Sequence, residues 1–91
     1  MIARQVFYAG RVQGVGFRFA TKQLAAGFDV VGWVRNLPDG RVELQVMGEE
    51  EEVDAFLEEL EENSSLAHHI LEKENRQIPL LQGTRGFSIE R

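Results

Sequence analysis

The sequence predicts a small α+β domain in which an antiparallel sheet carries two helices on one face. Two segments have apolar residues at helical spacing, one beginning after Gly16 and the other after Gly48. Segments rich in β-forming residues precede, separate and follow these helices. The order strand, helix, strand, strand, helix, strand is a split β-α-β, or ferredoxin-like, arrangement with four strands, to which the last residues can add a short fifth. The 91 residues make one domain, spanning 1–91, because two units would each be too small to bury a core.

The N-terminal third of the chain predicts a strand and then a helix. Residues 5–10 (QVFYAG) are rich in β-forming side chains and end at a glycine, which is typical of a strand. The helix is expected to stop near Gly27, since glycine favours a helix C-terminus. Its inward face is predicted to hold the apolar or small residues that recur every three or four positions: Phe17, Ala20, Thr21, Leu24, Ala25 and Phe28.

An antiparallel pair of strands is expected after the first helix. Residues 30–34 are largely apolar, and the only tryptophan, Trp33, is expected in the core. Residues 37–40 (LPDG) predict a turn, because the proline presets φ and the glycine supplies a positive φ. In residues 42–46 valine and leucine alternate with polar side chains, so this strand is expected to be half exposed.

The remaining elements are a second helix and two strands. Residues 49–52 are all glutamates, and they suit the first turn of a helix because its dipole favours negative charge. The apolar face of this helix is predicted from the spacing of Val53, Phe56, Leu57 and Leu60. Residues 66–78 alternate poorly and are predicted to form an edge strand. Residues 87–91 are predicted as a short final strand.

The charge is unevenly distributed along the chain. The net charge is −5, but residues 1–48 carry six basic and three acidic side chains (+3), whereas residues 49–91 carry four basic and twelve acidic ones (−8). An anionic substrate is therefore expected to be drawn to the N-terminal half. The acidic chain has no basic stripe, which argues against a nucleic-acid partner.

The amino-acid composition also indicates the cellular compartment and excludes some kinds of active site. The chain has no cysteine, hence no disulfide, thiol nucleophile or thiolate metal site, which fits a reducing compartment. Residues 1–5 (MIARQ) lack the apolar core of a signal peptide, and no apolar run approaches the length of a membrane span. The expected location is cytoplasmic, without a membrane partner, and a monomer is the simpler expectation.

Residues 10–18 (GRVQGVGFR) are the most informative segment. Glycines at positions 10, 14 and 16 allow positive φ and close approach of a ligand to the backbone. A loop that leads into a helix N-terminus presents unpaired N–H groups to an anion, and Arg18 adds a planar fork that matches phosphate oxygens. The glycine spacing fits neither the dinucleotide fingerprint nor the nucleoside-triphosphate loop. Taken alone, the segment is also compatible with a tight turn followed by a solvated arginine.

A second motif supports the anion-binding interpretation. Residues 32–42 (GWVRNLPDGRV), with Gly48 beyond, follow Arg18 at a spacing of fourteen positions to Gly32. Together the two segments resemble both signatures of the acylphosphatases, densely over residues 10–48 and more loosely over the whole chain. Tyr8 departs from the pattern, because that family usually has an aliphatic residue there. The match over residues 64–86 is loose, which leaves the arrangement of the last two strands open.

The resemblance implies an enzyme that hydrolyses the carboxyl-phosphate bond of acyl phosphates to a carboxylate and inorganic phosphate, without metal or cofactor. It implies that Arg18 binds the phosphate and that Asn36 orients the nucleophilic water. The residues alone favour a different role for Asn36, that of a bend residue ahead of Pro38, and only the resemblance favours the catalytic role. The substrate-binding residues are expected to be those of the loop, through their backbone N–H groups: Gln13, Gly14, Val15, Gly16, Phe17 and Arg18.

Other functions are less well supported by the sequence. His68 and His69 are adjacent, so in a strand they would point to opposite faces and could not share a metal ion. A phosphate-binding regulatory module is one alternative, since the same domain occurs fused to carbamoyl-transferring proteins. An RNA-binding module is another, but it needs exposed aromatic residues and a basic surface. The expected partners are a small acyl phosphate and inorganic phosphate, the latter as product and competitive inhibitor.

Overall fold

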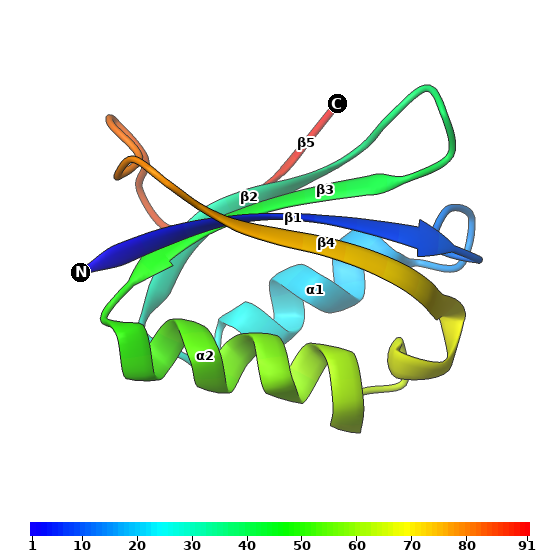
Figure 1. The fold of residues 1–91 in the computed structure, drawn as a ribbon, viewed down its shortest axis with the longest axis horizontal. Helices are drawn as coiled ribbons and strands as arrows, with labels where there is room; N and C mark the ends of the chain where they lie inside the picture. The colour runs from blue at the N-terminus through cyan, green and yellow to red at the C-terminus, as the bar shows by residue number, and fades with distance from the viewer.

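A computed structural model describes residues 1–91, and its elements follow the predicted order (Figure 1). The five strands are β1 (Ile2–Gly10), β2 (Val30–Asn36), β3 (Val42–Gly48), β4 (Ile70–Ile78) and β5 (Phe87–Glu90). The two α-helices are α1 (Phe17–Ala25) and α2 (Glu50–Glu58), and α2 continues into a π-helical turn at Glu59–Asn63. None of the helices combines the length and apolar character needed to cross a bilayer.

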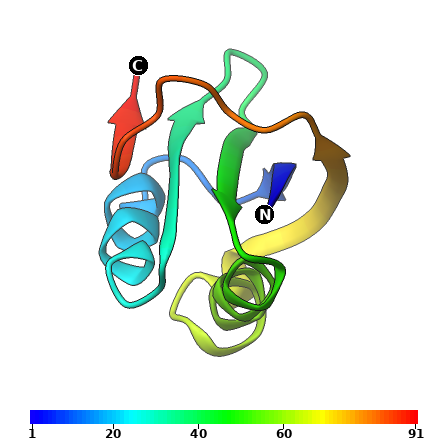
Figure 2. The same ribbon diagram turned by 90° about the vertical axis from the view of Figure 1, so that its left-hand side faces the viewer.

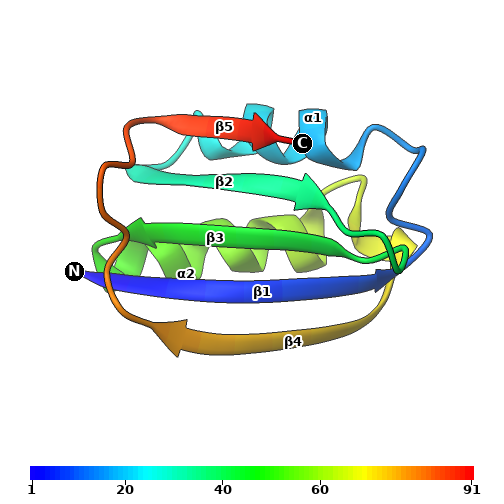
Figure 3. The ribbon, with the colours of Figure 1, turned by 90° about the horizontal axis from the view of Figure 1, so that it is seen from above.

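The strands form one mixed sheet in the order β4-β1-β3-β2-β5 (Figure 3). β2 pairs antiparallel with β3, as predicted. β1 lies between β3 and β4 and pairs antiparallel with both. The expectation of a wholly antiparallel sheet is wrong for β5, which runs parallel to β2. The physical reason is that the chain leaves β4 at one edge and crosses the end of the sheet to reach the other edge, where β5 starts beside the start of β2.

Both helices cover the same face of the sheet, and the core lies between them and the strands (Figure 2). The residues predicted to face inward from the first helix are either buried or packed against the core, although Phe28 lies just beyond α1. All four residues predicted for the second helix are buried, with Leu60 in the π-helical turn that continues α2. Three phenylalanines join the layers edge to face: Phe28 and Phe56 have ring centroids 5.8 Å apart, and Phe56 and Phe87 6.0 Å. This packing joins the end of the first helical segment, α2 and the start of β5 in one layer of the core.

The segment before β4 differs from the prediction. Ala67–His69 forms a single 3₁₀ turn, and the strand itself begins at Ile70. In this turn the rings of His68 and His69 lie side by side, with centroids 4.4 Å apart, so the expectation that they point to opposite faces is wrong. No group of three or more potential metal-ligating side chains forms there or elsewhere in the chain. The prediction of an edge strand is confirmed, because β4 pairs with β1 alone.

The face of the sheet without helices carries a polar network rather than an open apolar surface. Trp33 lies on this face, half-buried, with the guanidinium carbon of Arg35 5.1 Å from its ring centre, so its assignment to the core is wrong. Residues 30, 32 and 34 point toward the helices and are buried, which puts Trp33 on the other side of the strand.

Glu43 is only 3% exposed, although its strand position predicted a solvated side chain. Its carboxylate accepts hydrogen bonds from Gln5 Nε2 (2.7 Å), Gln45 Nε2 (3.0 Å) and Arg35 Nε (2.8 Å). Burial by itself raises the pKa of Glu43. The hydrogen bonds and the Arg35 charge together outweigh burial and hold this pKa below its ordinary value of 4.5.

We therefore expect Glu43 to make the fold acid-sensitive. A lowered pKa means that the ionised form stabilises the fold fully above about pH 4.5, and that this contribution is lost as pH falls through the folded-state pKa. Glu43→Gln should lower the free energy of unfolding at pH 7 by about 1–3 kcal/mol. The gap to the parent should shrink below pH 4.5, as measured by urea unfolding across pH. Glu51→Gln, at an exposed site, is the control, and an unchanged gap between pH 7 and pH 3 would contradict this role.

Candidate active site

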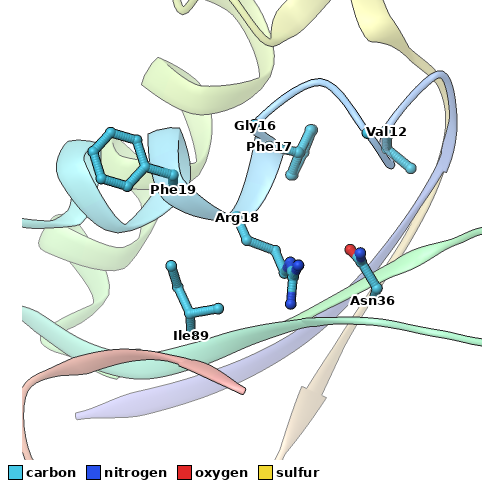
Figure 4. Close-up of a pocket in the computed structure, with 8 residues that line it drawn as sticks. Val12, Gly16, Phe17, Arg18, Phe19, Asn36 and Ile89 are labelled. Carbon is cyan, nitrogen blue, oxygen red and sulfur yellow. The ribbon is translucent and has the colours of Figure 1, made fainter. Parts of the chain in front are cut away.

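A pocket of about 210 Å³ lies between the 11–16 loop, the N-terminus of α1, the end of β2 and β5 (Figure 4). These elements meet there because α1 crosses over the sheet and begins beside the end of β2. The lining residues are Val12, Gly14, Gly16, Phe17, Arg18, Phe19, Asn36 and Ile89.

Two glycines in the left-handed region shape the loop. Gly14 has φ 78° and Gly16 has φ 74°, and a Cβ at either would meet only open space, so conformation rather than crowding calls for glycine. Gly16 is the residue before α1, and no side chain caps that helix. The N–H groups of its first turn are therefore left for a ligand. The loop is anchored by Val12, which is fully buried, and by the Arg11 N–H, which donates to the His69 carbonyl at 2.9 Å.

The side chain of Gln13 fastens this loop to the β2–β3 turn. Its Nε2 donates to the carbonyl of Leu37 at 2.8 Å and to that of Arg41 at 2.9 Å. The turn is itself closed by the Leu37 N–H, which donates to the Arg41 carbonyl at 2.8 Å. The same glutamine thus links the loop before α1 to the turn that follows Asn36, so the two motifs are held in one place.

Arg18 is half-buried and carries its charge without an acidic partner. It forms no ion pair, and its Nη1 donates only to the backbone carbonyl of Glu90 in β5, at 3.3 Å. In Figure 4 its guanidinium lies inside the pocket, near Asn36. Because arginine stays protonated and offers five donors, most of this group is free to bind an anion.

Asn36 is the last residue of β2, and its side chain faces the pocket. Its Oδ1 is buried and has no hydrogen-bond partner within the protein. A buried acceptor without a donor is costly, and a water molecule or ligand in the pocket can supply that donor. Asn36 therefore offers an acceptor a short way from the Arg18 cation.

Tyr8 of β1 packs in the core against Phe17, the first residue of α1. Its buried ring lies 5.6 Å from that of Phe17, centroid to centroid, and its hydroxyl donates to Glu61 Oε2 at 2.7 Å. Glu61 also pairs with Lys73. Burial, followed by the charge of Glu61, raises the pKa of Tyr8 well above 10, so the phenol stays neutral. A tyrosine can therefore occupy position 8, where an aliphatic residue was expected, because the Glu61 carboxylate accepts the hydrogen bond of its buried hydroxyl.

The structure brings most of the predicted site residues together. Gly14, Gly16, Phe17, Arg18 and Asn36 all line the pocket. Gln13 and Val15 are not lining residues: the Gln13 side chain is bound to the β2–β3 turn and the Val15 side chain is exposed, so their predicted role rests on the backbone N–H groups alone. The lining residues that sequence reasoning missed are Val12, Phe19 and Ile89. Phe19 directly follows Arg18 and could have been noticed, but nothing in the sequence indicates that β5 lies beside α1.

Comparison with known proteins identifies the family. The family model described as acylphosphatase matches residues 4–89. The chain belongs to the acylphosphatase family. An acylphosphatase from Pseudomonas paraeruginosa is 44% identical over 90 residues, which are 99% of this chain and 97% of the relative. One from Nitrosococcus oceani is 49% identical over 75 residues, or 81% of this chain and 84% of the relative.

Solved structures agree with this assignment. The crystal structure of acylphosphatase from Bacillus subtilis matches with a TM-score of 0.88 and 33% identity, and all of both chains is covered. Full-length HypF in its phosphate- and nucleotide-bound form matches with a TM-score of 0.83 and 32% identity, over 99% of this chain and 12% of that chain. The acylphosphatase fold therefore occurs both alone and as part of a much larger protein.

The Gln13 contacts predict that this side chain rigidifies the acylphosphatase loop. Gln13→Glu is close in size but cannot donate to two carbonyls, and its charge faces their oxygens. We expect it to lower the free energy of unfolding by about 0.5–1.5 kcal/mol and to speed amide hydrogen exchange in residues 11–16. Gln23→Glu, at an exposed position on α1, is the control. Equal exchange in both variants would show that Gln13 does not hold the loop.

Proposed function

We propose that this chain is an acylphosphatase that hydrolyses acyl phosphates to a carboxylate and inorganic phosphate, with Arg18 and Asn36 as its catalytic residues. One observation carries the proposal: a single pocket is lined by an arginine without an ion-pair partner, a glycine loop at a helix N-terminus and an asparagine whose buried oxygen has no hydrogen-bond donor. Membership of the acylphosphatase family supports the reaction class.

The phosphoryl group binds between the loop and Arg18. Backbone N–H groups of residues 13–18 surround its oxygens, and the guanidinium contacts two of them together. The partial positive charge at the start of α1 adds to this attraction. In phosphoryl transfer the protein mainly positions the reactants and stabilises charge on the equatorial oxygens, and these donors are preorganised for that task.

The attacking water is held by Asn36. Its free Oδ1 accepts one water hydrogen and so directs a lone pair of the water oxygen toward phosphorus. As the new P–O bond forms, the bond between phosphorus and the carboxyl oxygen breaks, and the carboxylate leaves with the electron pair. One water proton passes to a phosphoryl oxygen, which gives dihydrogen phosphate.

The leaving group needs no acid catalyst, because a carboxylate is a weak base. Accordingly, the pocket contains no carboxylate, histidine or thiol, and Arg18 is the only charged side chain in its lining. The proposal therefore includes activity without added metal or cofactor. It also includes competitive inhibition by the product phosphate, which fits the same donors.

We further propose that the protein acts as a monomer in the cytoplasm, without a nucleic-acid or membrane partner. The lack of cysteine fits a reducing compartment, and the acidic net charge disfavours nucleic acid. Size-exclusion chromatography with light scattering tests the oligomeric state, and fractionation of the source cells tests the location.

Arg18 should be essential, and lysine should not replace it. Lysine keeps the charge but lacks the planar fork that contacts two oxygens. We expect Arg18→Lys to lower kcat/KM for benzoyl phosphate, assayed with EDTA present, by at least about 100-fold. Circular dichroism and the urea midpoint should be unchanged. Arg85→Lys, at an exposed site, is the matched control. Near-parental hydrolysis by Arg18→Lys would refute the phosphate-binding role.

Asn36 should affect the chemical step more than binding. Its partner is the water, so Asn36→Ala should lower kcat by about 100-fold while KM and phosphate inhibition stay nearly unchanged. A bend residue would behave differently, because its loss would lower stability by about 1 kcal/mol and leave kcat intact. Kinetics and urea unfolding on one preparation separate the two roles. Asn75→Ala, at an exposed position on β4, is the control.

A further inference from the structure

Tyr8 connects the two ends of the 11–16 loop. Along the chain it lies just before Gly10, where β1 ends and the loop begins. Across the core its ring lies 5.6 Å, centroid to centroid, from that of Phe17, the residue with which α1 begins after the loop. Both residues are buried, with 0% of Tyr8 and 2% of Phe17 exposed. One side chain therefore links the point where the loop leaves the sheet to the point where it enters the helix.

The ring of Tyr8 is held in place by a hydrogen bond of its hydroxyl. This group donates to Glu61 Oε2 at 2.7 Å, and the other oxygen of the same carboxylate pairs with Lys73. The Glu61 side chain is only 10% exposed. Lys73 is directly opposite Tyr8 in the β1–β4 pairing, so both side chains lie on one face of the sheet and contact the same carboxylate. The three residues join β1, β4 and the π-helical turn that continues α2.

This hydrogen bond restrains the ring more than packing alone does. A hydroxyl that donates to a carboxylate forms a stronger bond than one between neutral groups, and burial strengthens it further. Apolar contacts are not directional, so a ring without the bond is free to slide within the core. Phe17 then loses a fixed neighbour. Because the N–H groups of Phe17 and Arg18 belong to the first turn of α1, a shift of Phe17 displaces donors that surround the phosphoryl group.

We propose that Tyr8 and Glu61 are positioning residues for phosphate binding. Their hydrogen bond fixes the Phe17 end of the loop, and its loss weakens phosphate binding without removing any group that touches phosphate. This inference rests on the proposed function for the place where phosphate binds. An aliphatic residue at position 8, which the resemblance leads one to expect, fills the core but cannot form this bond. The contact is therefore a feature of this chain that the two sequence motifs do not contain.

Phosphate affinity in matched variants tests the inference. Tyr8→Phe removes only the hydroxyl, and Glu61→Leu removes its acceptor. Each should raise the Kd of inorganic phosphate, measured by calorimetry, about threefold to tenfold. Glu61→Gln should raise it less, because its side-chain oxygen still accepts from the hydroxyl. Glu62→Leu, the same change at the exposed neighbouring position, is the control. An unchanged Kd in Tyr8→Phe would overturn the proposal.

The double variant Tyr8→Phe/Glu61→Leu separates positioning from a purely structural role. With both partners apolar, no buried hydroxyl is left without an acceptor, and Lys73, whose side chain is 51% exposed, can turn to solvent. The urea midpoint should therefore recover from that of Glu61→Leu. The Kd of phosphate should stay raised, because no hydrogen bond fixes the ring. A Kd that recovers together with the midpoint would contradict the inference.

Backbone dynamics of the free protein separate failure of this inference from failure of the proposed function. NMR relaxation should give lower amide order parameters for residues 13–18 in Tyr8→Phe than in the parent. A parent that binds no phosphate refutes the proposed function, and the order parameters then decide the inference. Lower values in Tyr8→Phe support it, and equal values overturn it.

Discussion

The site depends on one backbone constraint, the left-handed conformation of Gly14 and Gly16 between β1 and α1. Within six residues the chain must leave the sheet, fold around a ligand-sized space and start a helix across the same sheet. A side chain with a Cβ disfavours positive φ, so another residue at either position would reshape the turn. With these glycines in place, the start of α1 faces the end of β2, and Arg18 meets Asn36.

Three contacts with other parts of the fold keep the loop and Arg18 in this position. Gln13 connects the loop to the β2–β3 turn, Tyr8 packs under Phe17, and the Glu90 carbonyl of β5 accepts a hydrogen bond from Arg18. These contacts come from the β2–β3 turn, β1 and β5, so the shape of the pocket depends on the assembled sheet. This explains why a domain of 91 residues can present an ordered site without metal or disulfide.

Local patterns predicted most of the fold, because helix spacing and turn chemistry act over a few residues. The faces of α1 and α2, the β2–β3 hairpin and the anion-binding role of Arg18 were predicted in this way, and the resemblance to acylphosphatases added the catalytic role of Asn36. The errors depended on distant contacts. Trp33 was expected in the core and Glu43 in solvent. Only the assembled sheet shows that Gln5, Gln45 and Arg35 bury the carboxylate of Glu43. Ile89 lies in the pocket because β5 pairs with β2. The spacing of apolar residues along the sequence does not indicate which edge of the sheet the last strand joins.

The unpaired edge of β4 also affects the tendency of the protein to aggregate. This strand has nine residues and pairs on one side only, which leaves a row of N–H and C=O groups open. Exposed charges interrupt that row: Glu72, Lys73, Glu74 and Arg76. Charged edge strands resist the addition of a foreign strand, because joining would desolvate and crowd those groups. The same edge with apolar residues at these positions would be a template for aggregation, so the charges protect the fold in concentrated solution.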